Sequence, residues 1–106
     1  MIAKPENQVA VLGFLRFPPE KMQDVRAHLK KLVDETYKND GCIAYDVAED
    51  LFDAGLIRFS ELWPDAQMLS AHLKAAHIEP WRVAAKECGL LERHFIAYSV
   101  TGSWAV

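Results

Sequence analysis

The sequence has little of several features that mark particular classes of protein. It contains two cysteines, Cys42 and Cys88, with no CxxC pair and no histidine spacing around them that would build a zinc site. We interpret both as buried free thiols. It also has no excess of positive charge, since its formal net charge is -3 and its pI is near 5.7. Nucleic acids and anionic membranes attract clustered cations, so neither is an expected partner.

Long apolar runs are missing as well. No stretch approaches the ~18 consecutive apolar residues that span a membrane, and residues 1–7 lack the apolar region of a signal peptide. These features predict a cytoplasmic protein. A GxGxxG turn, a P-loop, an HExxH pair and a serine nucleophile elbow are also absent from the sequence. Nucleotide-dependent, metalloprotease and hydrolase chemistry therefore have no motif support.

The composition that remains is typical of a folded chain. Hydrophobic residues make up 51% of the sequence and charged residues 25%, which is well away from the composition of disordered proteins. With 106 residues, the chain is expected to form a single domain over 1–106. A domain of this size has a small core, so oligomerisation would help its stability.

Hydrophobic periodicity predicts the order strand, helix, strand, strand, helix pair, strand. The strands are expected at 9–17, at 42–49, at 56–63 and within 90–104, almost to the C-terminus; the helices are expected from 18 to about 39, from 64 onward and over 78–88. The strands at 42–49 and 56–63 are expected to pair as a hairpin. Gly13 interrupts the first strand, and we interpret it as a close packing contact rather than the floor of a pocket.

This order fits a ferredoxin-like βαββαβ fold of the α+β class, a four-stranded antiparallel sheet with helices on one face. The predicted strands are apolar on both faces, whereas the helices cover only one. The other face must therefore meet a partner, and a second copy of the chain is the simplest candidate. We predict a homodimer whose sheets pack face to face.

The stretch 60–77 carries the clearest chemical signal, a histidine on the apolar side of a short helix. That side is formed by Met68, Leu69, His72, Leu73 and Ala76. With an unperturbed pKa of ~6.5, His72 is a candidate catalytic base. The alternative is a core histidine satisfied by a backbone or carboxylate partner. His77, at the following helix junction, is expected to cap a helix or to face solvent.

Five further residues are candidate substrate contacts: Trp63, Trp81, Tyr45, Tyr98 and Arg58. The tryptophans can form flat walls for an aromatic ligand, or they can be core or dimer-interface residues. The tyrosine hydroxyls can bind a ligand oxygen or a backbone acceptor. The arginine can steady a phenolate or superoxide-like anion, or it can pair with Glu61 or Asp46.

Two segments resemble the antibiotic biosynthesis monooxygenase (ABM) family of the dimeric α/β-barrel superfamily. One is Asp40-Gly41-Cys42-Ile43-Ala44-Tyr45; the other is Glu61-Leu62-Trp63 followed by Met68-Leu69, Ala71-His72 and His77. The resemblance covers nearly all of the chain and implies a dimeric α/β barrel. It also implies a monooxygenase that oxidises a small hydrophobic phenolic or quinol-like compound without metal, flavin or another cofactor.

The resemblance also leaves alternatives open. The haem-degrading branch of the family has an asparagine where this chain has Gly13 and a tryptophan where it has His72, and the region of Arg82 lacks that branch's histidine. Haem degradation is therefore not expected. A non-catalytic dimeric module that holds an aromatic metabolite, and a structural dimer with a vestigial pocket, both remain. The residues that would bind a phenol are the ones that would activate it, so sequence does not separate binding from catalysis.

Overall fold

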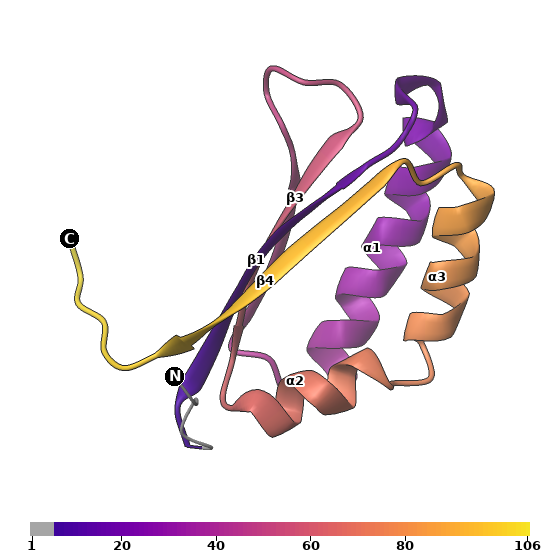
Figure 1. Ribbon diagram of the computed structural model, residues 1–106. Coiled ribbons are helices and arrows are strands. Elements are labelled where there is room, and N and C mark those ends of the chain that lie inside the picture. Colours follow the sequence, from indigo (N-terminus) through magenta and orange to yellow (C-terminus); the bar gives the residue numbers. More distant parts are fainter. Residues whose placement is uncertain (1–5) are drawn as a thin grey trace.

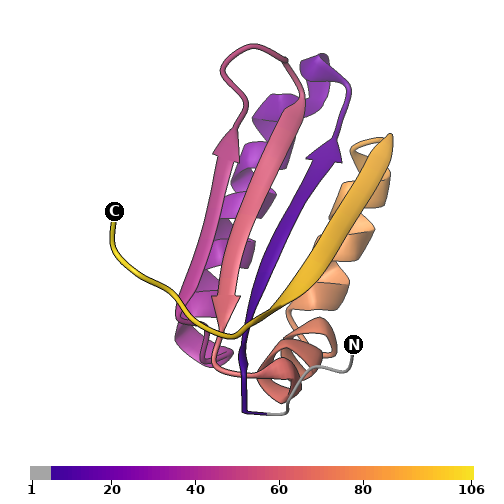
Figure 2. The same ribbon diagram turned by 60° about the vertical axis from the view of Figure 1, so that its left-hand side comes forward.

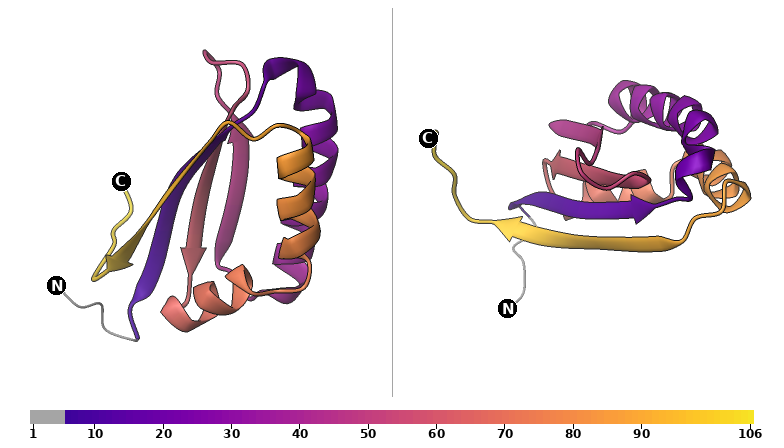
Figure 3. Two further views of the ribbon diagram at one scale, coloured as in Figure 1. Left: turned by 45° about the vertical axis from the view of Figure 1, so that its right-hand side comes forward. Right: turned by 90° about the horizontal axis from the view of Figure 1, so that it is seen from above.

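The computed structural model describes residues 6–106, which form one antiparallel sheet with helices on one of its faces (Figures 1 and 3). The strands are β1 (Gln8–Arg16), β2 (Ala44–Glu49), β3 (Leu56–Trp63) and β4 (Glu92–Val100), in the spatial order β2-β3-β1-β4. The helices are a short 3-10 helix η1 (Pro19–Lys21), α1 (Met22–Asn39), α2 (Ala66–Leu73) and α3 (Ile78–Glu87). The predicted ferredoxin-like α+β fold is confirmed.

Two predicted strand boundaries were wrong. β2 begins at Ala44 rather than at residue 42, because Gly41 turns the chain with a φ of 71° after α1. β4 ends at Val100, where its pairing partner β1 begins at Gln8. Residues 101–106 then run away from the sheet as an exposed tail (Figure 1). The first five residues of the predicted domain lie outside the described range.

The core lies between the sheet and α1. The buried residues of this helix recur at steps of three or four: Met22, Val25, Leu29, Leu32 and Thr36. They meet the sheet face that carries Val11, Ile57 and Trp63, which are 0–5% exposed. Burial of apolar side chains on this scale, at about 25 cal/mol per Å², supplies the main driving force for folding. None of the helices within 6–106 has the length and apolar character needed to cross a membrane.

The opposite face of the sheet is uncovered, and Figure 2 shows it with the helices behind. We call it the open face. It carries apolar side chains on β1 and β4 that are well exposed: Leu12 at 54%, Ile96 at 42% and Tyr98 at 50%. Side chains alternate between the two faces of a strand, so the same strands supply both the core and this apolar surface.

Gly13 lies in β1 directly between Phe59 of β3 and Phe95 of β4. A Cβ atom added at Gly13 would overlap the ring of Phe95. The interpretation of this glycine as a close packing contact is therefore confirmed. The ring of Phe95 also meets that of Phe59 edge-on, with 5.2 Å between centroids.

We predict that Gly13→Ala lowers the free energy of unfolding by about 1–3 kcal/mol, because the ring of Phe95 must move to admit the methyl group. Urea denaturation measures the change. Gly102→Ala is the matched control, since nothing lies within 4 Å of its added Cβ. A Gly13→Ala protein as stable as the wild type would contradict this account of the packing.

Candidate functional site

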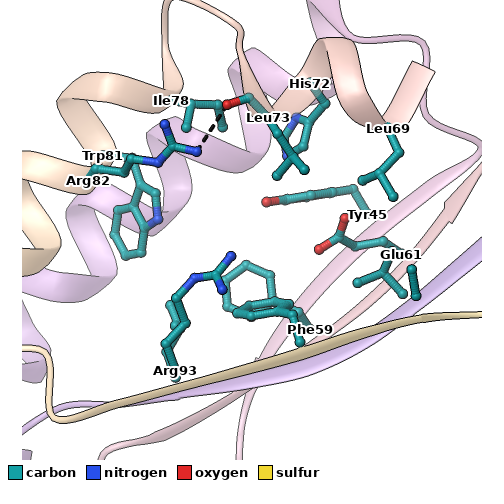
Figure 4. A pocket seen from close by; sticks show the side chains of 14 residues that line it. Tyr45, Phe59, Glu61, Leu69, His72, Leu73, Ile78, Trp81, Arg82 and Arg93 are labelled. Carbon is teal, nitrogen blue, oxygen red and sulfur yellow. Dashed lines mark hydrogen bonds between the residues drawn. The ribbon is translucent and has the colours of Figure 1, made fainter. Parts of the chain in front are cut away.

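A cavity of about 270 Å³ lies between the helix-covered face of the sheet and helices α2 and α3 (Figure 4). Its aromatic walls are Phe59, Phe95 and Trp81. The polar side chains that reach it are Tyr45, Glu61, His72, Arg82 and Arg93. Apolar walls with a few convergent polar groups are typical of a small-molecule site.

Helix α2 positions His72 above the sheet. The carboxylate of Asp65 caps the helix by accepting a hydrogen bond from the backbone N–H of Met68 at 2.8 Å, which fixes where the helix begins. His72 is then 3% exposed, and its ring lies 4.7 Å from that of Trp63 and 5.3 Å from that of Tyr45, centroid to centroid. These contacts hold the imidazole in one orientation at the cavity wall.

Asp40, at the C-terminal end of α1, joins two histidines. Its Oδ2 atom lies 2.6 Å from Nδ1 of His72 and 2.9 Å from Nε2 of His77, and its side chain is only 6% exposed. A carboxylate can only accept, so Nδ1 of His72 donates the hydrogen bond to Asp40. Nε2 of His72 is therefore the nitrogen left for the cavity. His77, expected at a cap or in solvent, instead contacts this buried acid.

Burial lowers the pKa of His72 below its usual value near 6.5, although the hydrogen bond to Asp40 opposes the shift. The imidazole is therefore neutral at pH 7 and has an unprotonated nitrogen. In this state it can take a proton from an acidic hydroxyl group in the cavity.

Tyr45 and Glu61 place two more oxygen-bearing groups in the cavity, below His72 in Figure 4. Burial raises the pKa of the Tyr45 phenol, so its hydroxyl stays protonated and can donate a hydrogen bond. Burial also raises the pKa of Glu61, which is 7% exposed. Oε1 of Glu61 accepts a hydrogen bond from the indole N–H of Trp63 at 2.9 Å, which opposes that shift.

The same cluster has the donor set of a divalent transition-metal site. The ligand atoms of Asp40, His72 and His77 all lie within 4.8 Å of one another. Two imidazole nitrogens and a carboxylate oxygen suit zinc or iron(II). Neither cysteine takes part. Both are free thiols, as predicted, and Cys88 is buried, but the prediction that Cys42 is buried was wrong, since it is only partly buried.

The model of the antibiotic biosynthesis monooxygenase family matches residues 8–84. The chain belongs to this family. The resemblance stated from the sequence is therefore confirmed.

Solved structures support the fold of this ABM protein. A proposed antibiotic biosynthesis monooxygenase from Deinococcus radiodurans is 24% identical with a TM-score of 0.86, covering 92% of this chain and 97% of that one. A conserved protein from Methanosarcina mazei is 27% identical with a TM-score of 0.80, covering 90% and 94%. Rv0793 from Mycobacterium tuberculosis is 22% identical with a TM-score of 0.80, covering 92% and 99%. Comparison with curated proteins finds no match.

The ABM cavity brings together three of the residues named from the sequence: His72, Tyr45 and Trp81. Trp63 is fully buried and supports His72 and Glu61 from behind rather than lining the cavity. Sequence reasoning missed Glu61 as a site residue. The available signal was an acid on the same strand face as three apolar side chains, where burial of a charge needs a reason.

Arg58 and Tyr98 do not share the cavity with His72. Strand alternation places both on the open face, where they border a shallow groove. The expected partners of Arg58 were also wrong: its Nε donates to Oδ1 of Asp50 at 2.9 Å, rather than to Glu61 or Asp46. The β2–β3 turn brings Asp50 close, whereas Glu61 points to the other face of β3.

We predict that Asp40→Ala lowers the free energy of unfolding by about 3 kcal/mol, because the buried His72 loses its acceptor and the partly buried His77 loses the carboxylate beside it. Chemical denaturation measures the loss. The control is Asp34→Ala, which removes an exposed aspartate of α1 and should change stability by less than ~0.5 kcal/mol. Equal stabilities for the two variants would show that Asp40 does not hold the helices together.

Proposed function

We propose that the chain is a cofactor-independent monooxygenase that oxidises a small hydrophobic phenolic or quinol-like compound. Family membership supports a monooxygenase. The single observation that carries the finer proposal is the Asp40–His72 pair, because it leaves a neutral imidazole nitrogen at an aromatic-walled cavity. In this chemistry the reduced substrate itself supplies the electrons to oxygen, so the protein must bind, deprotonate and shield it.

The reaction proposed for a quinol balances without another reductant. Nε2 of His72 takes a hydroxyl proton, and the hydroxyl of Tyr45 donates a hydrogen bond to the resulting phenolate. The phenolate passes one electron to dioxygen, and the two radicals combine to form a carbon–oxygen bond. His72 returns its proton to the peroxide, whose O–O bond breaks. One oxygen atom stays on the ring, giving a hydroxyquinone, and the other leaves as water with the two hydrogens that the substrate loses.

The size of the cavity favours a compact ligand. Small-molecule pockets commonly measure about 300–1,000 Å³, and this one, at about 270 Å³, suits one or two fused rings. It does not favour a tetrapyrrole. The cavity is not filled by its own side chains, so the structure gives no support to a vestigial pocket. A binding module for an aromatic metabolite stays as the alternative, and oxygen uptake separates it from an oxygenase.

We predict that the wild-type protein, prepared free of metal and flavin, consumes oxygen when reduced quinols of one or two rings are added. His72→Gln should lower this rate by about 10²–10⁴-fold, because glutamine can still donate to Asp40 but cannot accept the substrate's proton. An oxygen electrode measures the rate. His28→Gln, which changes an exposed histidine on α1, should leave it unaltered.

The pH profile gives an independent check. The base must be neutral, so activity should fall as the pH falls through the pKa of His72, and burial places this acid limb below 6.5. Tight ligand binding without oxygen uptake would favour the binding module. Unchanged turnover in His72→Gln would remove His72 from the mechanism.

We also propose that the open face packs against the open face of a second copy, forming a homodimer. The support is the exposed apolar surface around Leu12, Ile96 and Tyr98, which is unusual for a surface that meets only water. A two-fold arrangement buries the same residues of both copies. His94, stacked on Phe14 at 5.5 Å between centroids, extends this surface along the sheet.

We predict that Leu12→Lys converts a dimer to a monomer, because it places a charge in the centre of the proposed interface. Size-exclusion chromatography with light scattering measures the mass. The control is Phe52→Lys, which alters an apolar side chain that is 96% exposed in the β2–β3 loop and should leave a dimer. A wild-type monomer at micromolar concentration would disprove the proposal.

A further inference from the structure

One guanidinium group at the cavity differs from every other arginine that the structure describes. The other four arginines each have a carboxylate within 4.0 Å: Arg16 with Asp53 and Glu92, Arg26 with Glu49, Arg58 with Asp50, and Arg82 with Glu79. Arg93 has no such partner among residues 6–106. Its side chain is exposed, and its guanidinium carbon lies 4.7 Å from the centroid of the Phe95 ring, a cation–π contact.

The position of Arg93 in β4 places its guanidinium at the cavity. In β4 it pairs with Leu15 of β1, on the helix-covered face of the sheet, and it lines the cavity with Phe95. Figure 4 shows its guanidinium pointing into the cavity. A planar group with five N–H donors in this position matches a carboxylate or another planar anion.

Glu61 is the acidic side chain of the same cavity, and the charge of Arg93 favours its ionised form without forming an ion pair with it. Its Oε1 is bound to the indole of Trp63, and its carboxylate lies beyond the 4.0 Å limit of an ion pair with the guanidinium. The second guanidinium of the cavity, that of Arg82, is already bound to the backbone oxygen of Leu73 at 3.0 Å. The lining thus has an excess of positive charge in a chain whose net charge is -3.

We infer that Arg93 forms an anion-binding subsite, and that the substrate is a hydroxylated aromatic compound bearing a carboxylate or similar anionic group. The inference rests on the proposed function for the location of the ring, between Trp81 and the Phe59–Phe95 wall. The hydroxyl group then points to Tyr45 and His72, and the anionic group points to Arg93. The acidic side chain of Glu61 disfavours the reversed orientation, because it would face the anion.

Two ligands with the same fused ring test the subsite without turnover: 6-hydroxy-2-naphthoate carries the anion and 2-naphthol lacks it. Binding is measured for each by calorimetry. The wild type should bind the naphthoate about tenfold more tightly, as expected for one charge-assisted hydrogen-bonded pair. In Arg93→Gln the preference should disappear while the affinity for 2-naphthol stays within about twofold. Arg93→Lys should keep part of the preference for the naphthoate, since lysine retains the positive charge but lacks the planar guanidinium that binds a carboxylate through two hydrogen bonds.

Arg26→Gln is the matched control, because this arginine pairs with Glu49 outside the cavity, and it should keep the full preference. Raising the salt concentration should reduce the preference of the wild type. Equal affinities in the wild type, a preference that survives in Arg93→Gln, or no binding of either ligand would overturn the inference. If one of these results is obtained but neutral quinols still cause oxygen uptake, the anion-binding subsite is wrong and the proposed monooxygenase activity stands. If the preference for the naphthoate depends on Arg93 but no reduced substrate causes oxygen uptake, the anion-binding subsite is supported and the proposed oxygenase activity is contradicted.

Discussion

The buried carboxylate of Asp40 is the group on which the arrangement of helices and cavity depends. A carboxylate taken out of water is costly unless polar groups replace its hydration. Here Nδ1 of His72 in α2 donates to Asp40, and Nε2 of His77, just before α3, lies 2.9 Å from the same oxygen. One acid at the end of α1 therefore fixes two other helices. The same hydrogen bond sets which nitrogen of His72 carries the proton, and hence which one faces the cavity. A requirement of stability thus determines the chemistry available at the site.

The shape of the cavity depends in turn on the sheet beneath it. Gly13 has no side chain on the helix-covered face of β1, so the ring of Phe95 can occupy that space and meet Phe59. The aromatic wall that results supports the guanidinium of Arg93. A larger residue at this position would move the wall and the cation together. The glycine therefore contributes to the site although it provides no functional group.

Local sequence patterns predicted the elements and the faces of the strands, because each depends on residues only a few positions apart. They did not predict that Asp40, His72 and His77 lie close together. This proximity depends on how three helix ends pack, and no local sequence pattern reports it. The error over Arg58 and Tyr98 has another origin. Strand alternation already placed them opposite the helix-covered face, but their chemical types were given more weight than their positions.

The polar and aromatic groups of the site form one connected structure. Trp63 lies against His72 and donates its indole N–H to Glu61, so a fully buried side chain orients both of these groups. Such support reduces the reorganisation needed when charge develops on a bound ring. The unpaired guanidinium of Arg93 and the buried acid Glu61 add little to stability by themselves. The two charges face each other across one cavity without direct contact, which leaves room for a ligand between them.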